Sequence, residues 1–249
     1  MKIKVDPKQV AVAFLWVAAV LAVINSVLLF FYFYLGDDKL FGLIDLFDFD
    51  IEGNVPTLYS ALSILFCAAL LALITRVHWH KPAGKRFYWL GLTILFVFLA
   101  IDEGAAIHEE VSTFLERYMD ARGALYFLWV VPYGIAVLVL GLAYLKFVWE
   151  LPRDTRARFV TAGVIFLTGA LGIEMLGARE AAFYGTATLT YCLLYSLEEM
   201  LEMLGIIVFI YALLSHLAQE TGRVSVVFDL ADDGSSPGGA DVETRERQS

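Results

Sequence analysis

The sequence predicts an all-α fold, a polytopic integral membrane protein built as a bundle of six transmembrane helices. Hydrophobic residues make up 59% of the 249 residues. They form long unbroken blocks, whereas a soluble domain breaks its apolar residues into helical or strand periods. A helix needs about 20 apolar residues to cross a bilayer, so the chain has room for about six spans and little else.

Three spans fill the first half of the chain. Residues 10–35 follow a lysine-containing N-terminus, as the core of a signal peptide would. Their apolar run is about twice as long as such a core and no small-residue cleavage site follows, so a retained first span is expected. An acidic, aromatic loop at 36–56 leads to the second span, 57–75. A basic loop at 76–86 then precedes the third span, 87–108.

The second half of the chain supplies the other three spans. The fourth, 124–148, contains Pro132, and this proline is expected to kink the helix. An arginine-rich loop leads to the fifth span, 159–178. The sixth span lies within residues 187–217.

The basic residues fall on alternate sides of these spans. The N-terminus, the loop 76–86 and the arginine-rich loop before the fifth span share one side, which the positive-inside rule makes cytoplasmic. We therefore expect a multi-pass protein of the cell membrane with both termini in the cytoplasm. Residues 1–218 are expected to form one transmembrane domain. Residues 219–249 are rich in Gly, Ser and Asp, which predicts a disordered cytoplasmic tail.

The third span carries the first indication of a functional site. Its apolar run Phe87–Ile101 covers only about 22 Å, whereas the bilayer core is about 30 Å thick. The helix must therefore continue through Asp102 and Glu103 to the surface near His108, unless it ends near Ile101 and leaves these acids in water. A charged group at the middle of a membrane helix costs roughly 2.5–3.5 kcal/mol, so acids at such a depth are functional candidates.

Two further spans carry acids at a similar depth. Glu174 follows a short apolar run in the fifth span, which crosses the membrane in the same direction as the third. The first half of the sixth span, which runs the opposite way, contains Glu198, Glu199 and Glu202. At 100° per residue, these three glutamates share one face of their helix. Carboxylates from three helices are thus expected to meet in the outer half of the bilayer.

So many acids, with one histidine and few bases at that depth, must hold protons or surround a cation. Carboxylates with a single imidazole suit a divalent metal, and Fe, Mn and Zn are the candidates. We expect the metal ligands to be Asp102, Glu103, Glu174, Glu198 and Glu202. The residues expected to transfer protons as catalytic groups are Glu109, within the inner group of acids, and His108, at the rim of the site. Three further residues on the sixth span accompany the cluster: Glu199, Tyr191 and Tyr195.

Three functions are compatible with such a cluster. The first is a membrane enzyme that uses the bound metal to act on a lipid-soluble substrate. The second is a divalent cation transporter or proton-coupled transporter that uses the same acids. The third is a membrane scaffold in which protonated acids only join the helices. The position of the cluster toward one face, without an unwound Gly-Pro break nearby, favours the enzyme over the transporter.

Other features narrow the partners to the lipid bilayer and a membrane-soluble small molecule or cation. The chain has 27 acidic and 18 basic residues, a formal net charge of −9, which argues against nucleic acid binding. Cys67 and Cys192 lie in apolar blocks and indicate no disulfide framework. The segment 48–53 is interpreted as an acidic interfacial loop with aromatic anchors. Three histidines near the cytoplasmic face are interpreted as ordinary interfacial residues: His78, His80 and His216.

Overall fold

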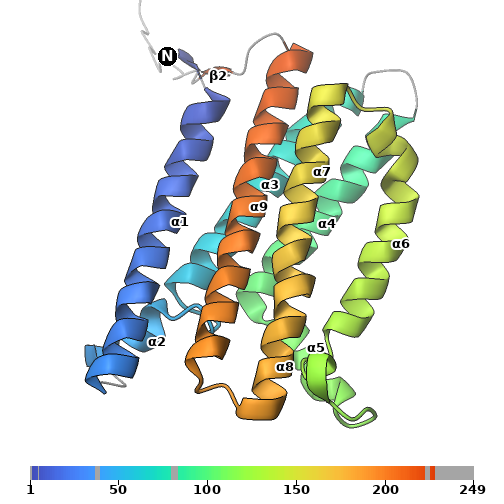
Figure 1. Cartoon of the computed structure of the whole chain (residues 1–249). Helices are drawn as coiled ribbons and strands as arrows, with labels where there is room; N and C mark the ends of the chain where they lie inside the picture. The colour runs from blue at the N-terminus through green and yellow to red at the C-terminus, as the bar shows by residue number, and fades with distance from the viewer. Residues whose placement is uncertain (1, 5, 37–39, 80–83, 222–224, 228–249) are drawn as a thin grey trace, which may run out of the picture.

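The computed structural model describes residues 2–4, 6–36, 40–79, 84–221 and 225–227. Within these residues the chain forms a bundle of long helices joined by short connections (Figure 1). Six helices are long and apolar enough to cross a membrane, which confirms the predicted set of candidate spans. They comprise residues Pro7–Leu35, Val55–Trp79, Lys85–Ala105, Val130–Trp149, Arg153–Tyr184 and Leu189–Thr221.

Two of the six spans are made of more than one element. The first consists of α1 (Pro7–Phe30) and the π-helical segment η1 (Phe31–Leu35). The fifth consists of α7 (Arg153–Leu167), the π-helical segment η4 (Thr168–Ile173) and α8 (Glu174–Tyr184). The remaining spans are α3 (Val55–Trp79), α4 (Lys85–Ala105), α6 (Val130–Trp149) and α9 (Leu189–Thr221).

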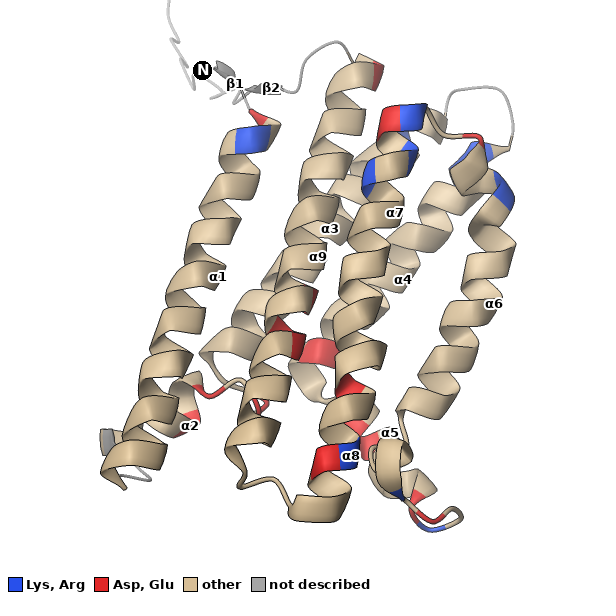
Figure 2. Cartoon of the chain, in the orientation of Figure 1, with Lys and Arg blue, Asp and Glu red and all other residues tan. Residues whose placement is uncertain are grey.

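Short elements complete the described chain. The helical ones are η2 (Leu40–Gly42), α2 (Leu43–Phe47), α5 (Ile107–Leu115) and η3 (Gly123–Leu125). The strands β1 (Lys2–Lys4) and β2 (Ser225–Val227) pair antiparallel, with Lys2 opposite Val227. This pair lies at the upper end of the bundle in Figure 1, where α1 begins and α9 ends. Most of the acids within the helices lie in the lower half, although the upper ends of α7 and α9 also carry acids, and most of the coloured Lys and Arg residues lie at the upper ends of the helices (Figure 2).

The helix α9 forms the centre of the bundle and is the most buried of the six spans, whereas α4 and α6 are the least buried. Trp89 of α4, Leu71 of α3 and Ile210 of α9 are completely buried in one apolar core. In contrast, α6 exposes large apolar side chains such as Leu138 and Leu142, at 63% and 66%. Such an apolar outer face is suited to lipid, since soluble monomers rarely expose continuous patches of this kind.

The sequence allows the helix of the third span either to end near Ile101 or to continue to His108, and the structure differs from both. The helix α4 continues past Ile101 to Ala105, so Asp102 and Glu103 lie within it. It does not run on to His108, because Ala106 adopts a left-handed conformation (φ 50°, ψ 41°) that ends α4 and starts α5 in a new direction. The expectation of one continuous helix through His108 is therefore wrong.

The boundaries of two other segments also need correction. The fourth span begins at Val130, because η3 occupies the region where residue 124 was expected to start it. Pro132 lies in the first turn of α6, where its missing N–H leaves no intrahelical hydrogen bond unmade, so it does not interrupt the helix. At the other end, α9 continues to Thr221 and β2 follows, both within the segment predicted to be a disordered tail. The rest of that segment, 228–249, lies outside the described residues.

Candidate functional site

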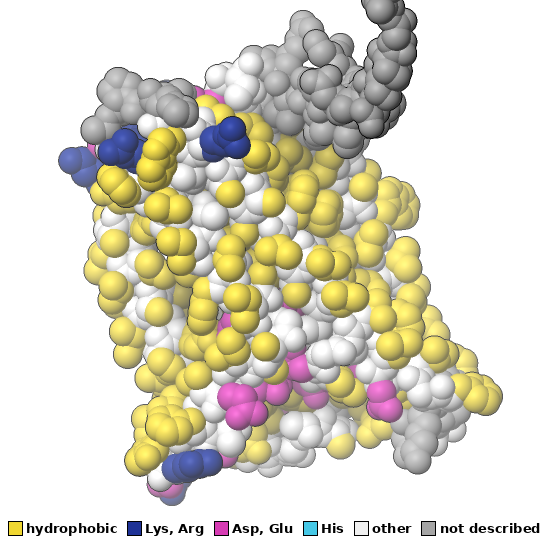
Figure 3. Space-filling view, turned by 180° about the vertical axis from the view of Figure 1, so that it is seen from behind, with side chains coloured by type: hydrophobic (Ala, Val, Ile, Leu, Met, Phe, Trp, Pro, Cys, Tyr) yellow, Lys and Arg dark blue, Asp and Glu magenta, His cyan; other side chains and the backbone are white. Residues whose placement is uncertain are grey.

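A cavity of about 700 Å³, here called the acidic cavity, lies among α4, α5, α6, α8 and α9 and the 49–52 loop. It occupies the part of the bundle where the helical acids gather (Figure 2). Seen from behind, acidic side chains also reach the surface there, below a band of hydrophobic side chains (Figure 3). All ten predicted site residues line this cavity: Asp102, Glu103, His108, Glu109, Glu174, Tyr191, Tyr195, Glu198, Glu199 and Glu202.

His108 lies inside the cluster, although its helical phase predicted a position at the rim. Its Nε2 is 3.4 Å from Oε1 of Glu52, and its Nδ1 is 3.6 Å from Oδ2 of Asp102. Burial opposes the charged imidazolium, but the two carboxylates outweigh it and raise the pKa of His108 to about 11. The other oxygen of Asp102, Oδ1, accepts a hydrogen bond of 2.7 Å from the Tyr133 hydroxyl. Both oxygens of Asp102 thus have partners within the protein.

Trp129 joins this histidine to the acids of the fifth span. Its indole Nε1 donates a 2.9 Å hydrogen bond to Oε1 of Glu174, and its ring packs edge-on against His108 at 5.1 Å between centroids. The main-chain nitrogen of Trp129 donates to Oγ of Ser112, at 2.9 Å. These contacts fix the start of α6 against α5 and orient the Glu174 carboxyl group toward the cavity.

The remaining acids face one another across α4, α8 and α9. The carboxyl groups of Glu174 and Glu198 lie within hydrogen-bonding reach of each other. Glu103, Glu199 and Glu202 lie close enough for strong mutual electrostatic interaction. Acids from three spans therefore meet, as their depth in the sequence predicts, while their roles as metal ligands stay predictions.

A glycine allows α9 to approach η4 at this point. A Cβ atom at Gly169 would lie 2.8 Å from the main-chain oxygen of Glu198 and 3.1 Å from Cγ of Glu202. Any larger residue would push the two segments apart. The π-helical geometry of η4 adds a residue to the turn just before Glu174, and such segments are frequent at functional sites.

Asp50 and Glu52 reach the cavity from the loop before α3. The hydroxyl of Tyr191 donates a 2.7 Å hydrogen bond to Oδ1 of Asp50. Burial raises the pKa of Asp50 to about 6, and repulsion from Asp48 and Glu109 contributes to the shift. Asp50 is an exposed residue that lines the cavity.

The charge of the cavity lining is unbalanced. The lining contains carboxyl groups from three spans and two loops, and His108 is the one basic side chain among the described lining residues. An unpaired carboxylate away from water is costly, so the cluster requires bound protons or bound cations. The arrangement is therefore suited to holding a positive ion or a cationic group.

An apolar chamber of about 280 Å³ continues the acidic cavity toward the other end of the bundle. Both spaces are lined by the same six residues: Leu95, Phe96, Leu99, Leu140, Gly163 and Phe166. Beyond them the chamber is lined by aliphatic and aromatic side chains of α4, α6, α7 and α9, and Tyr144 is the one lining residue with a polar side chain in the part of the chain that the structure describes. The combined space is thus acidic at one end and apolar along the rest.

A family model covers nearly the whole bundle. Residues 10–217 match the model described as domain of unknown function (DUF8692). The chain belongs to this family. The DUF8692 match extends from α1 to the last turns of α9 and so includes all six spans, the acidic cavity and the apolar chamber. No curated protein and no solved structure matches the chain.

Another group of side chains in the described structure could hold a metal ion. Ligand atoms of His78, His216 and Glu220 all lie within 4.8 Å of one another. None of the five predicted metal ligands belongs to this group, which lies at the opposite, upper end of the bundle. His78 and His216 had been interpreted as ordinary interfacial residues, and the third histidine so interpreted, His80, lies outside the described residues.

Several lining residues were not predicted from the sequence. Glu52 and Asp50 lie in a loop that resembles any acidic interfacial segment, and only the tertiary fold brings this loop under His108. Trp129 and Tyr133 were not distinguished from other aromatic residues of an apolar span. The one usable signal was their position at the start of a span, at the depth of the acids on neighbouring helices.

Proposed function

We propose that the protein is a membrane enzyme that acts on a lipid-soluble substrate, with a divalent metal ion held by carboxylates of the acidic cavity. The observation that carries this proposal is the continuity of the acidic cavity with the apolar chamber. A molecule with a polar head and a hydrocarbon chain fits this division, since ligand pockets combine an apolar lining with a few polar groups that fix orientation.

We assign the metal to the carboxyl groups of Glu103, Glu174, Glu198 and Glu202. Asp102 is the least suitable of the five predicted ligands, because its two oxygens already contact Tyr133 and His108. A metal in this position would polarise a carbonyl or phosphoryl oxygen or activate a bound water. Of the three predicted metals, Mn suits a set of carboxylate oxygens best, whereas Fe and Zn more often take an imidazole as well.

The proposed proton-transfer roles are supported by the surroundings of two residues beside the proposed metal ligands. His108 has a pKa of about 11, so it is an imidazolium at neutral pH and would donate a proton as a general acid. Burial and the nearby carboxylate of Glu52 raise the pKa of Glu109, which brings this carboxyl group closer to the range of a general base.

A divalent cation or proton transporter is the second candidate, and η4 is the observation that favours it. Transporter sites are typically formed at interrupted helices, and η4 interrupts the regular α-helix directly before Glu174. The apolar lining of the chamber weighs against this reading, because an ion moving beyond the acids would meet aliphatic and aromatic side chains.

Elemental analysis tests the metal. The natural protein and the variant Glu198→Gln/Glu202→Gln are purified in detergent, and their metal contents are compared. We expect the variant to lose Fe, Mn or Zn that the natural protein retains, because the amide oxygens carry no charge. Equal metal content in the two proteins would contradict the metal assignment.

A matched pair of substitutions on α6 tests the substrate class. A Cβ atom at Gly141 or Gly134 would meet nothing within 4 Å, but only Gly141 lines the apolar chamber. Gly141→Leu should fill the chamber and reduce the lipid that co-purifies with the protein, measured by mass spectrometry. Gly134→Leu should retain the lipid, and equal lipid in both variants would count against a substrate in the chamber.

A further inference from the structure

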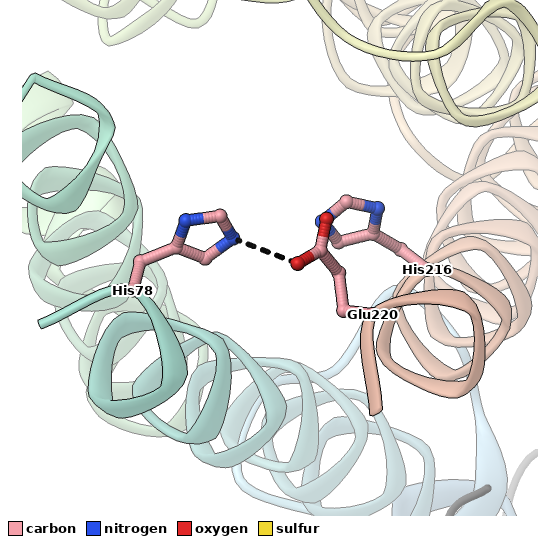
Figure 4. Close-up of side chains that lie close together, drawn as sticks. All are labelled: His78, His216 and Glu220. Atoms are coloured by element: carbon pink, nitrogen blue, oxygen red, sulfur yellow. Dashed lines mark ion pairs between the residues drawn. The ribbon is translucent and has the colours of Figure 1, made fainter. Parts of the chain in front are cut away.

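We infer that His78, His216 and Glu220 form a second metal site, suited to zinc or a similar divalent ion, at the upper end of the bundle. His78 lies near the end of α3, while His216 and Glu220 lie one turn apart near the end of α9. The three side chains point toward one another between the two helices (Figure 4). Nε2 of His78 is 3.9 Å from Oε2 of Glu220, and all three ligand atoms lie within 4.8 Å of one another.

The two imidazole rings are held in place by an aromatic stack. They are parallel within 4°, with 6.4 Å between centroids. The buried indole of Trp89 stacks on both, at 5.8 Å from His78 and 5.1 Å from His216. Rings fixed in this way lose little conformational freedom on binding an ion, which is the main requirement of a preorganised site.

Nδ1 of His216 contacts a protein hydroxyl group, as the ring nitrogen that does not bind the metal commonly does in metal-bound histidines. Oγ1 of Thr155 lies 3.5 Å from Nδ1 of His216, and both residues are buried. Metal-ligating histidines commonly engage their other ring nitrogen with a protein group, because that contact fixes the ring and the tautomer. The contact with Thr155 favours Nε2 as the ligand atom of His216.

The distances between the ligand atoms are close to those that zinc requires. With zinc–ligand bonds of about 2.0–2.2 Å, ligand atoms of a tetrahedral site lie roughly 3.3–3.5 Å apart. The ligand atoms of the three residues are therefore somewhat farther apart than in a zinc-bound site. The Glu220 side chain is 26% exposed and lies in the last turn of α9, so it can move toward the two imidazoles. Two imidazoles and one carboxylate leave the fourth position to water or another ligand.

This site is separate from the acidic cavity. Fourteen residues of continuous helix separate Glu202 from His216 on α9, which corresponds to roughly 21 Å at 1.5 Å per residue. An ion at the upper site would join the ends of α3 and α9. Loss of either metal should therefore leave the other in place, so the two assignments can be tested independently.

The test uses zinc chloride and the full-length protein after removal of metal by a chelator. Zinc retained after desalting and the shift of the melting temperature are measured for the natural protein, His78→Gln and Glu220→Gln. We expect about one zinc ion per chain to be lost in each variant, together with the zinc-dependent rise in melting temperature. Both substitutions preserve the size of a partly exposed side chain, so the metal-free variants should fold.

Two controls separate this site from other zinc-binding groups. Glu150→Gln removes an exposed carboxylate at the same end of the bundle, and Glu198→Gln/Glu202→Gln removes acids of the acidic cavity. Both should keep the zinc that His78→Gln and Glu220→Gln lose. If His78→Gln and Glu220→Gln retain as much zinc as the natural protein, the three residues form only an ion pair and a stack, and the inference is wrong.

Discussion

His108 and Asp102 form the most constrained pair in the acidic cavity. Each nitrogen of the imidazole faces a carboxylate, and Tyr133 fixes the other oxygen of Asp102. Charge-assisted contacts of this kind strengthen where water is scarce, because less solvent screens them. We therefore expect Asp102 to position His108, while the glutamates of α4, α8 and α9 remain the candidate ligands of an ion or a substrate.

Asp50 should make stability depend on pH. Its pKa of about 6 in the folded protein lies above the ordinary 3.8, so the folded state favours the protonated form. That contribution to stability is fully present below about pH 4 and is lost as the pH rises through 6. Asp50→Asn keeps an oxygen that accepts the Tyr191 hydroxyl but cannot ionise. We therefore expect the natural protein to lose thermal stability relative to Asp50→Asn between pH 4 and 7.

Comparison of the two proteins at each pH separates the ionisation of Asp50 from the pH response that the two proteins share. The carboxyl groups of Asp48 and Glu109 face this position in both proteins. Parallel melting-temperature profiles across this range would show that Asp50 does not titrate as its surroundings indicate.

Ala106 should tolerate glycine but not valine. A left-handed conformation costs an L-residue roughly 1–2 kcal/mol, and a β-branched side chain is the least compatible with it. Ala106→Val should therefore lower the free energy of unfolding by about 1–2 kcal/mol. Ala106→Gly should match or slightly exceed the natural stability, since relief of strain offsets the extra unfolded-state entropy. Unfolding in detergent measures both, and equal stability of the two variants would contradict the role of this bend.

The elements that shape the cavity are the interrupted ones. The bend at Ala106 turns α5 so that His108 faces back toward α4, and η4 re-aims Glu174 before α8 begins. On the opposite side of the cavity, α9 packs closely against η4 and α7. Gly169 lets η4 touch the turn of α9 that carries Glu198, and Gly205 lets α9 touch α7.

Gly205, the one glycine of α9, should tolerate no larger side chain. A Cβ atom there would lie 2.8 Å from both the main-chain nitrogen and the Cβ of Phe166, and a main-chain atom cannot move without shifting α7. Gly205→Ala should lower the free energy of unfolding by about 1–3 kcal/mol, despite the better helix propensity of alanine. Gly163→Ala on α7 is the control, because its Cβ would meet nothing within 4 Å and should be neutral or stabilising. A similar loss of stability in Gly205→Ala and Gly163→Ala would show that the close approach of α9 to α7 does not cause the effect.

The length of the apolar runs was the main sequence feature from which the site could be predicted. Runs too short to span a bilayer placed Asp102, Glu103 and Glu174 inside their helices, and this depends only on the rise per residue. The bend at Ala106 could not be predicted, because alanine is a strong helix former and its conformation is imposed by tertiary contacts. The contact between Glu52 and His108 could not be predicted either, because Glu52 lies in a loop and the position of a loop does not follow from sequence periodicity.

At the scale of the whole molecule, two polar sites lie at opposite ends of an apolar bundle. The acidic cavity lies toward the lower end, and the His78 group lies at the upper end, where Lys and Arg also gather (Figure 2). The apolar chamber extends from the acidic cavity toward the basic end. If the positive-inside rule holds, the cavity opens toward the outer leaflet and a substrate would enter from there.

This orientation can be tested with single cysteines at the two ends. Arg122 and Lys85 have side chains that are 81% and 40% exposed, and the natural Cys67 and Cys192 are buried and should react little. We expect Arg122→Cys to react with a membrane-impermeant maleimide in intact cells, and Lys85→Cys to react only after lysis. The physical reason is that the side with the excess of lysine and arginine, on which Lys85 lies, is retained in the cytoplasm. The reverse pattern would place the acidic cavity on the cytoplasmic side, and labelling of both residues in intact cells would contradict a membrane-spanning bundle.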